Sequence, residues 1–264
     1  MMNKTPRLSK SNIEYLDYVW NFASGCTKGC THCYAKKIAT RFPGHYPDGF
    51  EPTLYPEALT SPLRLKKPSV IGVVFMGDLF DDAINPYQFT GRRGDPLLLQ
   101  AALKDRIFET IEHCPQHRFL FLTKQPQNLA KWAPFPDNCW VGVSVTDDKM
   151  LREAHEHLLG VEARVKYLSF EPLLTWDWQD DKSTGPFSPP GTLMDYLDDL
   201  IDWLIIGAQT KPTVMPKVEW VREIVEAADA AGIPVFLKDS LDDLLGWKYR
   251  PDMIHLRQEM PNED

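Results

Sequence analysis

Three of the chain's five cysteines lie close together, at Cys26, Cys30 and Cys33, in the spacing C-x3-C-x2-C. Thiols so crowded are unusual for ordinary packing. Three kinds of site would use them: a disulfide knot, a zinc site, or an iron–sulfur cluster with one iron left without a protein ligand. Gly25 and Gly29 supply the backbone freedom that a short loop needs to wrap around a ligand. The spacing therefore predicts a ligand-binding loop and leaves its ligand open.

A disulfide knot is the least favoured of these sites. Five cysteines are an odd number, and neither a secretory signal nor a long apolar run is recognisable in the sequence. We therefore expect a cytoplasmic protein whose thiols stay reduced and whose chain spans no membrane. A zinc site needs a fourth ligand, which His32 or His45 could supply. Cys114 and Cys139 stand alone in the sequence and are expected either to pack or to lie at the surface, without a ligand.

An iron–sulfur cluster held by only three cysteines keeps one iron open to another molecule, whereas four thiolates would leave it able only to carry electrons. The segment 35–39, which follows the loop, is helix-like. Its first N–H groups would point toward the sulfurs and favour their negative charge. The three-cysteine spacing and the helix-like segment after it are the two features on which we interpret the loop as a cluster site.

Composition predicts one domain over residues 1–264, because a chain with 43% hydrophobic residues can bury a sizeable core. Acidic residues outnumber basic ones by 37 to 29, and the net charge is −8. This acidic excess argues mildly against a protein that binds duplex nucleic acid through its net charge. A local basic groove is still compatible with the composition.

The elements that would position the loop follow a regular alternation. Near-continuous apolar runs predict buried strands at 70–76, 118–123, 140–145, 165–170, 203–207 and 234–237, with 18–23 as a first strand. Helical patterns are expected at 97–113, 147–159 and 220–231, with one or two turns at 128–132. Strands that alternate with helices indicate βαβ units and a parallel sheet.

The predicted fold is therefore α/β, a partial (β/α) barrel with six to seven parallel strands, and the alternative is an open doubly wound sheet. Two segments interrupt the alternation as loop insertions, near 81–96 and 175–191. Each follows a strand end, where barrel loops build sites. The second carries Trp176 and Trp178, which could stack on a base or simply pack within the loop.

The cysteine spacing after a first strand, in a chain of βα repeats, resembles the radical S-adenosylmethionine (SAM) superfamily. That resemblance implies a [4Fe–4S] cluster on Cys26, Cys30 and Cys33, with SAM bound to the fourth iron. It also implies an electron from a reduced flavodoxin or ferredoxin type of partner, and reductive cleavage of SAM to a 5′-deoxyadenosyl radical. The implied fold is a partial or full (β/α) barrel.

The chain is most similar to a phage- and mobile-element-associated three-cysteine family of unassigned function. The blocks that carry this similarity are 25–35, 76–80, 122–124, 141–144, 168–174 and 203–207. The chain departs from that family at two points. Its first cysteine gap is shorter than is common there, and Gly207-Ala208-Gln209-Thr210 stands where Gly-Gly-Glu-Ser is frequent. No role is therefore carried over to Gln209.

A more distant similarity is to spore photoproduct lyase, a radical SAM enzyme of DNA repair. It implies that Asp78 takes the amino group of SAM and that Lys124 and Ser144 hold its carboxylate, pairings that suit their charges. The lyase has a hydrogen-donor cysteine where this chain has Met76, so its repair chemistry does not carry over. Tyr34, after the last cysteine, is the candidate for a catalytic role near the adenosyl group.

Glu171 interrupts a hydrophobic strand, so its carboxylate must be paired or face a cavity, and we assign it to ribose hydroxyls or substrate. Lys238, at the end of the last strand, is a weaker candidate. The sequence thus predicts a radical SAM enzyme, with a nucleic acid or nucleotide-like molecule as the first candidate substrate for repair, lysis or modification. The alternative is a zinc- or cluster-stabilised binding or sensor protein without radical chemistry.

Overall fold

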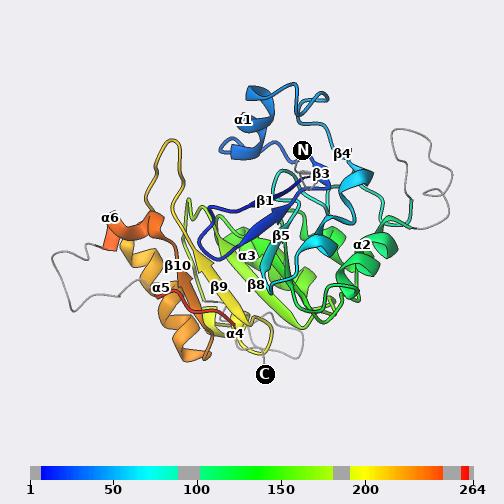
Figure 1. Ribbon diagram of the computed structural model, residues 1–264. Coiled ribbons are helices and arrows are strands. Elements are labelled where there is room, and N and C mark those ends of the chain that lie inside the picture. Colours follow the sequence, from blue (N-terminus) through cyan, green and yellow to red (C-terminus); the bar gives the residue numbers. More distant parts are fainter. Residues whose placement is uncertain (1–6, 89–101, 181–190, 246–256, 262–264) are drawn as a thin grey trace. The chain divides into compact units, whose positions relative to one another are not determined.

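The computed structural model describes residues 7–88, 102–180, 191–245 and 257–261 (Figure 1). Contacts within the chain divide it into two compact units. The first unit is Met1–Val141 with Val161–Arg164, and the second is Gly142–Gly160 with Val165–Asp264. Eight strands belong to one mostly parallel sheet, and helices connect them. The predicted α/β class is therefore confirmed.

The first unit contains four strands in the order β1-β2-β5-β6. Their bounds are Leu8–Lys10, Tyr18–Trp20, Val70–Val73 and Arg118–Thr123. β1 runs antiparallel to β2, while β2, β5 and β6 are parallel to one another. Because parallel strands end at the same edge, the residues that follow β5 and β6 are brought together there.

The helices of the first unit are short. They are α1 (Tyr34–Arg41), α2 (Leu103–Glu112) and the 3₁₀ turns η1 (Pro56–Ala58), η2 (Ser61–Arg64) and η3 (Pro126–Lys131). A small two-stranded antiparallel sheet pairs β3 (Ala23–Ser24) with β4 (Thr53–Leu54). The cysteine loop lies between β3 and α1, so its two ends are held by a strand of this sheet and by a helix.

Aromatic side chains form much of the first unit's core. Phe80 packs against Trp132 and Phe121, with ring centroids 5.6 and 6.0 Å apart. Trp20 is fully buried and its indole N–H donates to the carbonyl oxygen of Ala58 at 2.7 Å. Burying an aromatic side chain of this size stabilises a fold by about 1.5–3 kcal/mol. The segments that follow β5 and β6 are thus held by core packing as well as by the sheet.

The second unit contains β8 (Val165–Phe170), β9 (Trp203–Ile206) and β10 (Val235–Leu237), which are parallel. β7 (Cys139–Ser144) has residues in both units. The helices are α3 (Asp148–Leu158), α4 (Leu193–Leu197), α5 (Val218–Ala230) and α6 (Asp242–Leu245), with the 3₁₀ turn η4 (Asp239–Leu241). α4 packs against α5.

Local signals explain how the second unit's helices begin and how its last described segment is held. Asp147 caps α3, accepting the N–H of Met150 at 2.8 Å.

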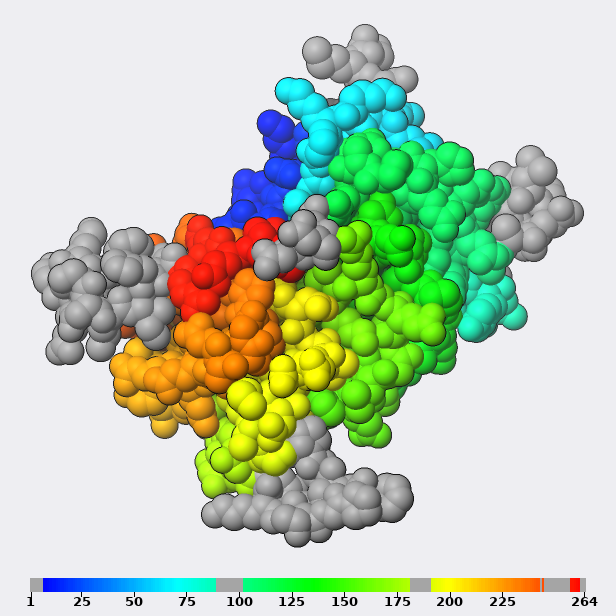
Figure 2. All heavy atoms as spheres, turned by 90° about the horizontal axis from the view of Figure 1, so that it is seen from below, coloured from blue at the N-terminus to red at the C-terminus, as the bar shows by residue number. Residues whose placement is uncertain are grey.

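Figure 2 shows residues 257–261, in red, against α5, in orange. Arg257 pairs there with Asp229 of α5 at 2.5 Å. A bridge between Gln258 and Phe236 joins the same segment to β10.

The predicted strands 118–123 and 165–170 coincide with β6 and β8. The predicted strand 70–76 is too long. β5 ends at Val73 because Val74 takes a φ of 58° and turns the chain away from the sheet. The predicted first strand 18–23 divides into β2 and β3. In the described residues the strand order is open, with β1 and β10 at its ends, so the partial barrel stays a prediction.

Residues 89–96 of the first predicted insertion, 181–190 of the second and 97–101 of the predicted helix 97–113 lie outside the described residues. None of the helices in the described ranges is both long and apolar enough to cross a membrane.

Candidate functional site

The cysteine loop begins at a close contact between two glycines. Gly25 takes a φ of +87°, and its N–H donates to the carbonyl oxygen of Met76 at 3.0 Å. A Cβ on Gly25 would lie 2.2 Å from the carbonyl oxygen of Glu51, and one on Gly77 would lie 2.4 Å from that of Gly25. Only glycine fits at either position. The loop is thereby fixed, backbone against backbone, to the turn that follows β5.

Asp81 holds the next part of the loop. Its carboxylate, 1% exposed, accepts the N–H of Thr27 at 2.7 Å and the amide N–H of Gln125 at 2.9 Å. Burial alone would raise the pKa of Asp81, but the N–H groups of Thr27 and Ala83 and the side chains of Gln125 and Thr27 outweigh it and lower that pKa. Asp81 thus binds the loop to the segments that follow β5 and β6.

The three loop thiols differ from the other two cysteines in exposure. Cys26, Cys30 and Cys33 are free and partly exposed, whereas Cys114 and Cys139 are free and buried, one of the two positions that the sequence allowed for them. Burial raises the pKa of both buried thiols, which suits inert packing. Among the five cysteines, the accessible thiols are therefore those of the loop.

Backbone N–H groups point at two of the loop sulfurs. The N–H of Lys28 donates to Cys26 Sγ at 3.3 Å, and that of Lys36 donates to Cys33 Sγ at 3.4 Å. Cys33 is the N-cap of α1, so the expected helix after the loop is confirmed and its N-terminus faces a sulfur. Such donors stabilise negative sulfur, as in metal-bound thiolates.

The Cys26 thiol is not activated by its surroundings alone. Burial raises its pKa to about 12; the Lys28 N–H lowers it, and the carboxylates of Asp78 and Asp81 raise it. A thiol in this setting keeps its proton until a metal ion displaces it. The loop's anchoring acids therefore disfavour a free thiolate and leave metal coordination as its route to one.

The sulfur donors of the loop suit the metal centres that the sequence suggests. Within 7–88, 102–180, 191–245 and 257–261, no three or more His, Cys, Asp or Glu side chains are gathered as a metal-binding group. Three soft sulfur donors on one anchored loop, two of them accepting N–H groups, nevertheless fit iron–sulfur or zinc chemistry. The fit lies in the chemistry of the donors and in their shared loop.

Asp78 lies past the end of β5, as predicted, and is 6% exposed. It accepts the hydroxyl of Thr123 at 2.8 Å, the N–H of Lys124 at 3.1 Å and the N–H of Phe80 at 3.0 Å. Burial raises its pKa, while these hydrogen bonds lower it by less. Asp78 therefore joins the ends of β5 and β6, a structural role beside any contact with a ligand.

Lys124 and His32 lie within electrostatic reach of each other. Burial lowers the pKa of His32, and the charges of Lys124 and Lys37 lower it further. His32 Nε2 is buried and has no hydrogen-bond partner among the described residues. His45 instead faces a cation, since its Nε2 lies 3.4 Å from Arg7 Nη1. Of the two histidines considered for zinc, His32 is the better placed.

Tyr34 is the first residue of α1 and is 50% exposed. Its hydroxyl donates to the carbonyl oxygen of Phe75, in the turn after β5. The ring therefore lies beside the cysteine loop with its polar end bound to the chain and much of its face accessible.

The second unit holds the remaining predicted residues. Ser144 is the last residue of β7 and is 3% exposed. Glu171, directly after β8, pairs with Lys238 at the end of β10. Gly207 follows β9 between them, and a Cβ there would lie 3.1 Å from Lys238 Cδ. The carboxylate of Glu171 is thus paired with a cation, one of the two environments that the sequence allowed.

A family of sequences described as "Protein of unknown function (DUF5131)" matches residues 10–243. The chain belongs to this family. The matched range includes the cysteine loop, Asp78, Lys124, Ser144 and Glu171. A comparison with curated proteins gives no match.

Several residues of this DUF5131 member hold the loop or join the strand ends beside it, but were not among the predicted ones. They are Thr27, Asp81, Thr123 and Gln125. Thr123 and Gln125 flank Lys124, and Asp81 follows Asp78 by three positions. The only sequence signal is the concentration of polar residues just past two apolar strands, where parallel strands place their sites.

Trp176 and Trp178 of the second unit stack on each other, with ring centroids 5.9 Å apart and an interplanar angle of 17°. Arg152 covers Trp178, with its Cζ 4.2 Å from the ring centroid. The two indoles are 5% and 8% exposed. Their faces are used within the unit, so packing, and not base stacking, explains them.

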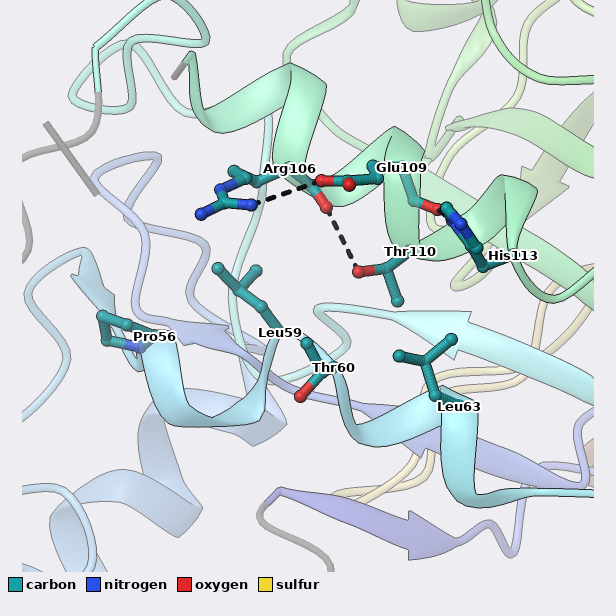
Figure 3. A pocket seen from close by; sticks show the side chains of 8 residues that line it. All are labelled: Pro56, Leu59, Thr60, Leu63, Arg106, Glu109, Thr110 and His113. Atoms are coloured by element: carbon teal, nitrogen blue, oxygen red, sulfur yellow. Dashed lines mark hydrogen bonds and ion pairs between the residues drawn. The ribbon is translucent and has the colours of Figure 1, made fainter. Parts of the chain in front are cut away.

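Two of the cavities among the described residues lie in the first unit. One, of about 300 Å³, lies between η1, η2 and α2 and contains none of the predicted residues (Figure 3). Arg106 and Glu109 on its wall pair with each other at 3.3 Å. The other, of about 420 Å³, is lined by Glu51 and Asp48, among others. Since Glu51 contacts Gly25, the second cavity is the one that adjoins the cysteine loop.

Proposed function

We propose that this DUF5131 member is a radical SAM enzyme whose cluster is bound by Cys26, Cys30 and Cys33. The observation that carries the proposal is the loop itself, in which three partly exposed thiols share an anchored backbone that donates N–H groups to two of them. When bound, such a cluster supplies the electron that cleaves SAM reductively to methionine and a 5′-deoxyadenosyl radical.

The chain's own residues would bind and orient the cofactors. Asp81 and the Gly25–Gly77 contact keep the loop in place. We assign the ammonium of SAM to Asp78 and its carboxylate to Lys124, whose charge suits it. From the resemblance, we also assign Ser144 to the SAM carboxylate. Glu171 stays assigned to the ribose hydroxyls or the substrate, and Tyr34 is the candidate for a catalytic role.

The rest of the proposal follows from the same resemblance. The fold is a partial (β/α) barrel of the radical SAM type, and the enzyme works in the reducing cytoplasm. Its electron comes from a reduced flavodoxin or ferredoxin type of partner. Its substrate is a nucleic acid or nucleotide-like molecule, which it repairs, cleaves or modifies.

Anaerobic reconstitution with iron and sulfide tests the cluster. We expect about four irons per chain and a brown colour from sulfide-to-iron charge transfer. Incubation with SAM and dithionite should then release 5′-deoxyadenosine, measured by mass spectrometry. Cys30→Ala should lose both signals, while the matched variant Cys114→Ala, in the core, should keep them. A fully loaded cluster that yields no 5′-deoxyadenosine would overturn the enzyme and leave a sensor.

A zinc-stabilised binding protein is the second candidate, and the buried Nε2 of His32 favours it. In that case the purified chain is colourless and holds about one zinc. His32→Ala should then release the metal, as Cys30→Ala does. A cluster enzyme instead keeps its iron after His32→Ala, so this one variant separates the two proposals.

A further inference from the structure

Helix α1 carries an apolar stripe that faces away from the core. Tyr34, Ile38 and Phe42 recur at a spacing of four residues, which places them along one side of a helix. They are 50%, 37% and 52% exposed. The neighbouring side of α1 is buried, where Ala35 and Ala39 pack in a small cluster with Tyr46 and Met76. The helix is therefore held by its small residues and presents its large ones to the outside.

This stripe lies in the most basic stretch of an acidic chain. Residues 18–47 contain four basic side chains and no aspartate or glutamate, although the whole chain has a net charge of −8. The four are Lys28, Lys36, Lys37 and Arg41, and all are exposed. Arg41 also covers the Phe42 ring, with its Cζ 5.5 Å from the centroid. Lys37 and Arg41, three positions after Tyr34 and Ile38, therefore flank the apolar stripe, while Lys36 lies on the opposite side of the helix.

The position of the stripe adds a third observation. α1 begins at Tyr34, directly after Cys33, and Lys28 lies within the cysteine loop. A protein that covers this side of α1 would therefore contact the edge of the loop. Short distance to a metal centre is what electron transfer between proteins requires, and such complexes are small and short-lived.

We propose that the α1 face, meaning Tyr34, Ile38 and Phe42 with Lys37 and Arg41, is the docking surface for a small acidic electron-carrier protein of the flavodoxin kind. The inference rests on the proposed function, since it is the cysteine loop that needs the electron. An acidic carrier is repelled by the net charge of the chain and attracted by this basic stretch, so charge favours the face. The apolar stripe then supplies the contact.

Binding of a purified bacterial flavodoxin tests the charges without any need for the cluster. Oxidised, ¹⁵N-labelled flavodoxin is titrated with the full chain at low salt, and its amide shifts give the Kd. Lys37→Glu with Arg41→Glu should weaken binding about tenfold or more, because rim charges steer such encounters. The control is Lys66→Glu with Lys67→Glu, which makes the same charge change at exposed residues before β5. It should stay within about twofold of the parent.

The apolar part has its own matched pair. Ile38→Ser should weaken flavodoxin binding about threefold to tenfold, because it removes apolar contact from the centre of the face. Leu63→Ser is the control, since Leu63 is 40% exposed against 37% for Ile38 and lies on η2. Equal effects of the two serine variants would overturn the assignment of the stripe.

Enzyme turnover separates this surface from the proposed function. With dithionite, the Lys37/Arg41 variant should form 5′-deoxyadenosine at the parent rate, while with flavodoxin hydroquinone it should be slower by about the loss in binding. If the parent chain forms no 5′-deoxyadenosine with dithionite, the proposed function is contradicted. The flavodoxin titrations still test the docking surface in that case. If the parent chain does not bind flavodoxin, the docking face is overturned. It is also overturned if the charge-reversed variant still binds flavodoxin but no longer binds a labelled single-stranded oligonucleotide, because α1 would then be a nucleic-acid surface.

Discussion

Strand ends carry carboxylates in both units, but the two units satisfy them differently. After β5, Asp78 and Asp81 accept hydrogen bonds from N–H and O–H groups of the loop and of the segment after β6. After β8, Glu171 is paired with the cation of Lys238. The first arrangement fixes backbone in a defined shape, while the second balances two charges. The first unit is thus built to hold a loop, and the second to hold a charged pair beside a glycine.

The largest effect should come from Gly25→Ala, which tests whether the first unit depends on its backbone shape. The added Cβ would lie 2.2 Å from the Glu51 carbonyl oxygen at a φ of +87°. We expect a loss of about 3–5 kcal/mol in the free energy of unfolding, measured with urea.

Gly29→Ala is the matched control for that change. Gly29 has a φ of +75°, but its nearest neighbour to a Cβ is 3.9 Å away. It should lose only about 1 kcal/mol, the conformational part of the effect. Similar losses for both variants would mean that the close contact at Gly25 is not what holds the loop.

The charged pair of the second unit should respond to removal of one member. Lys238→Met leaves the Glu171 carboxylate, whose side chain is 28% exposed, without its cation. We expect about 1–3 kcal/mol of destabilisation in urea, below the cost of breaking a fully buried pair.

Adding Glu171→Gln should recover part of that loss, because no uncompensated charge then remains. Recovery is the signature of a charge pair. If the double variant is as unstable as the sum of the single ones, the two side chains contribute separately and the contrast between the units fails.

Acid titration should give opposite signs in the two units. Burial raises the pKa of Asp78 above its ordinary 3.8, so the folded chain holds that proton to higher pH than the unfolded chain does. Asp78 therefore makes stability fall as pH rises from about 3.8 through its raised folded pKa. Asp78→Asn should remove this fall, seen in urea unfolding across pH 3–7.

Glu259 in the second unit has the opposite shift. The hydrogen bond from Arg257 lowers its pKa below the ordinary 4.5. Its contribution is therefore present above pH 4.5 and lost as pH falls through the folded pKa. Glu259→Gln should reduce the acid-induced loss. If Asp78→Asn and Glu259→Gln change the pH dependence of stability in the same direction, burial does not dominate the pKa of Asp78.

The sequence predicted most strands and the position of the loop, but not the residues that anchor it. β6 and β8 are continuous apolar runs with clear ends, and a parallel sheet needs such runs. The three cysteines were found from spacing alone. Asp81 was not, because its partner Thr27 lies 54 residues away, and no local pattern reports such a contact. The same reason hides the bond between Thr123 and Asp78, 45 residues apart.

The limits of β5 show a second kind of missed information. The apolar run continues to Met76, and a run of this kind predicts strand to its end. The chain instead turns at Val74, whose φ of 58° is unfavourable for a β-branched residue. Hydrogen bonds from Gly25 N–H to Met76 and from Met76 N–H to Asn21 hold that turn. Tertiary bonds thus override local preference at the point where the loop is attached.

The smallest effect should come from an exposed ion pair, which sharpens the contrast with Glu171 and Lys238. Arg106 and Glu109 on α2 lie 3.3 Å apart, with side chains 38% and 57% exposed. Water screens such a pair and solvates either partner alone, so Arg106→Gln should change the free energy of unfolding by less than about 0.5 kcal/mol. The measurement is urea unfolding at low and high salt. If Arg106→Gln lowers the free energy of unfolding as much as Lys238→Met does, exposure does not distinguish the two ion pairs. The pair at the strand ends of the second unit would then have no special role in stability.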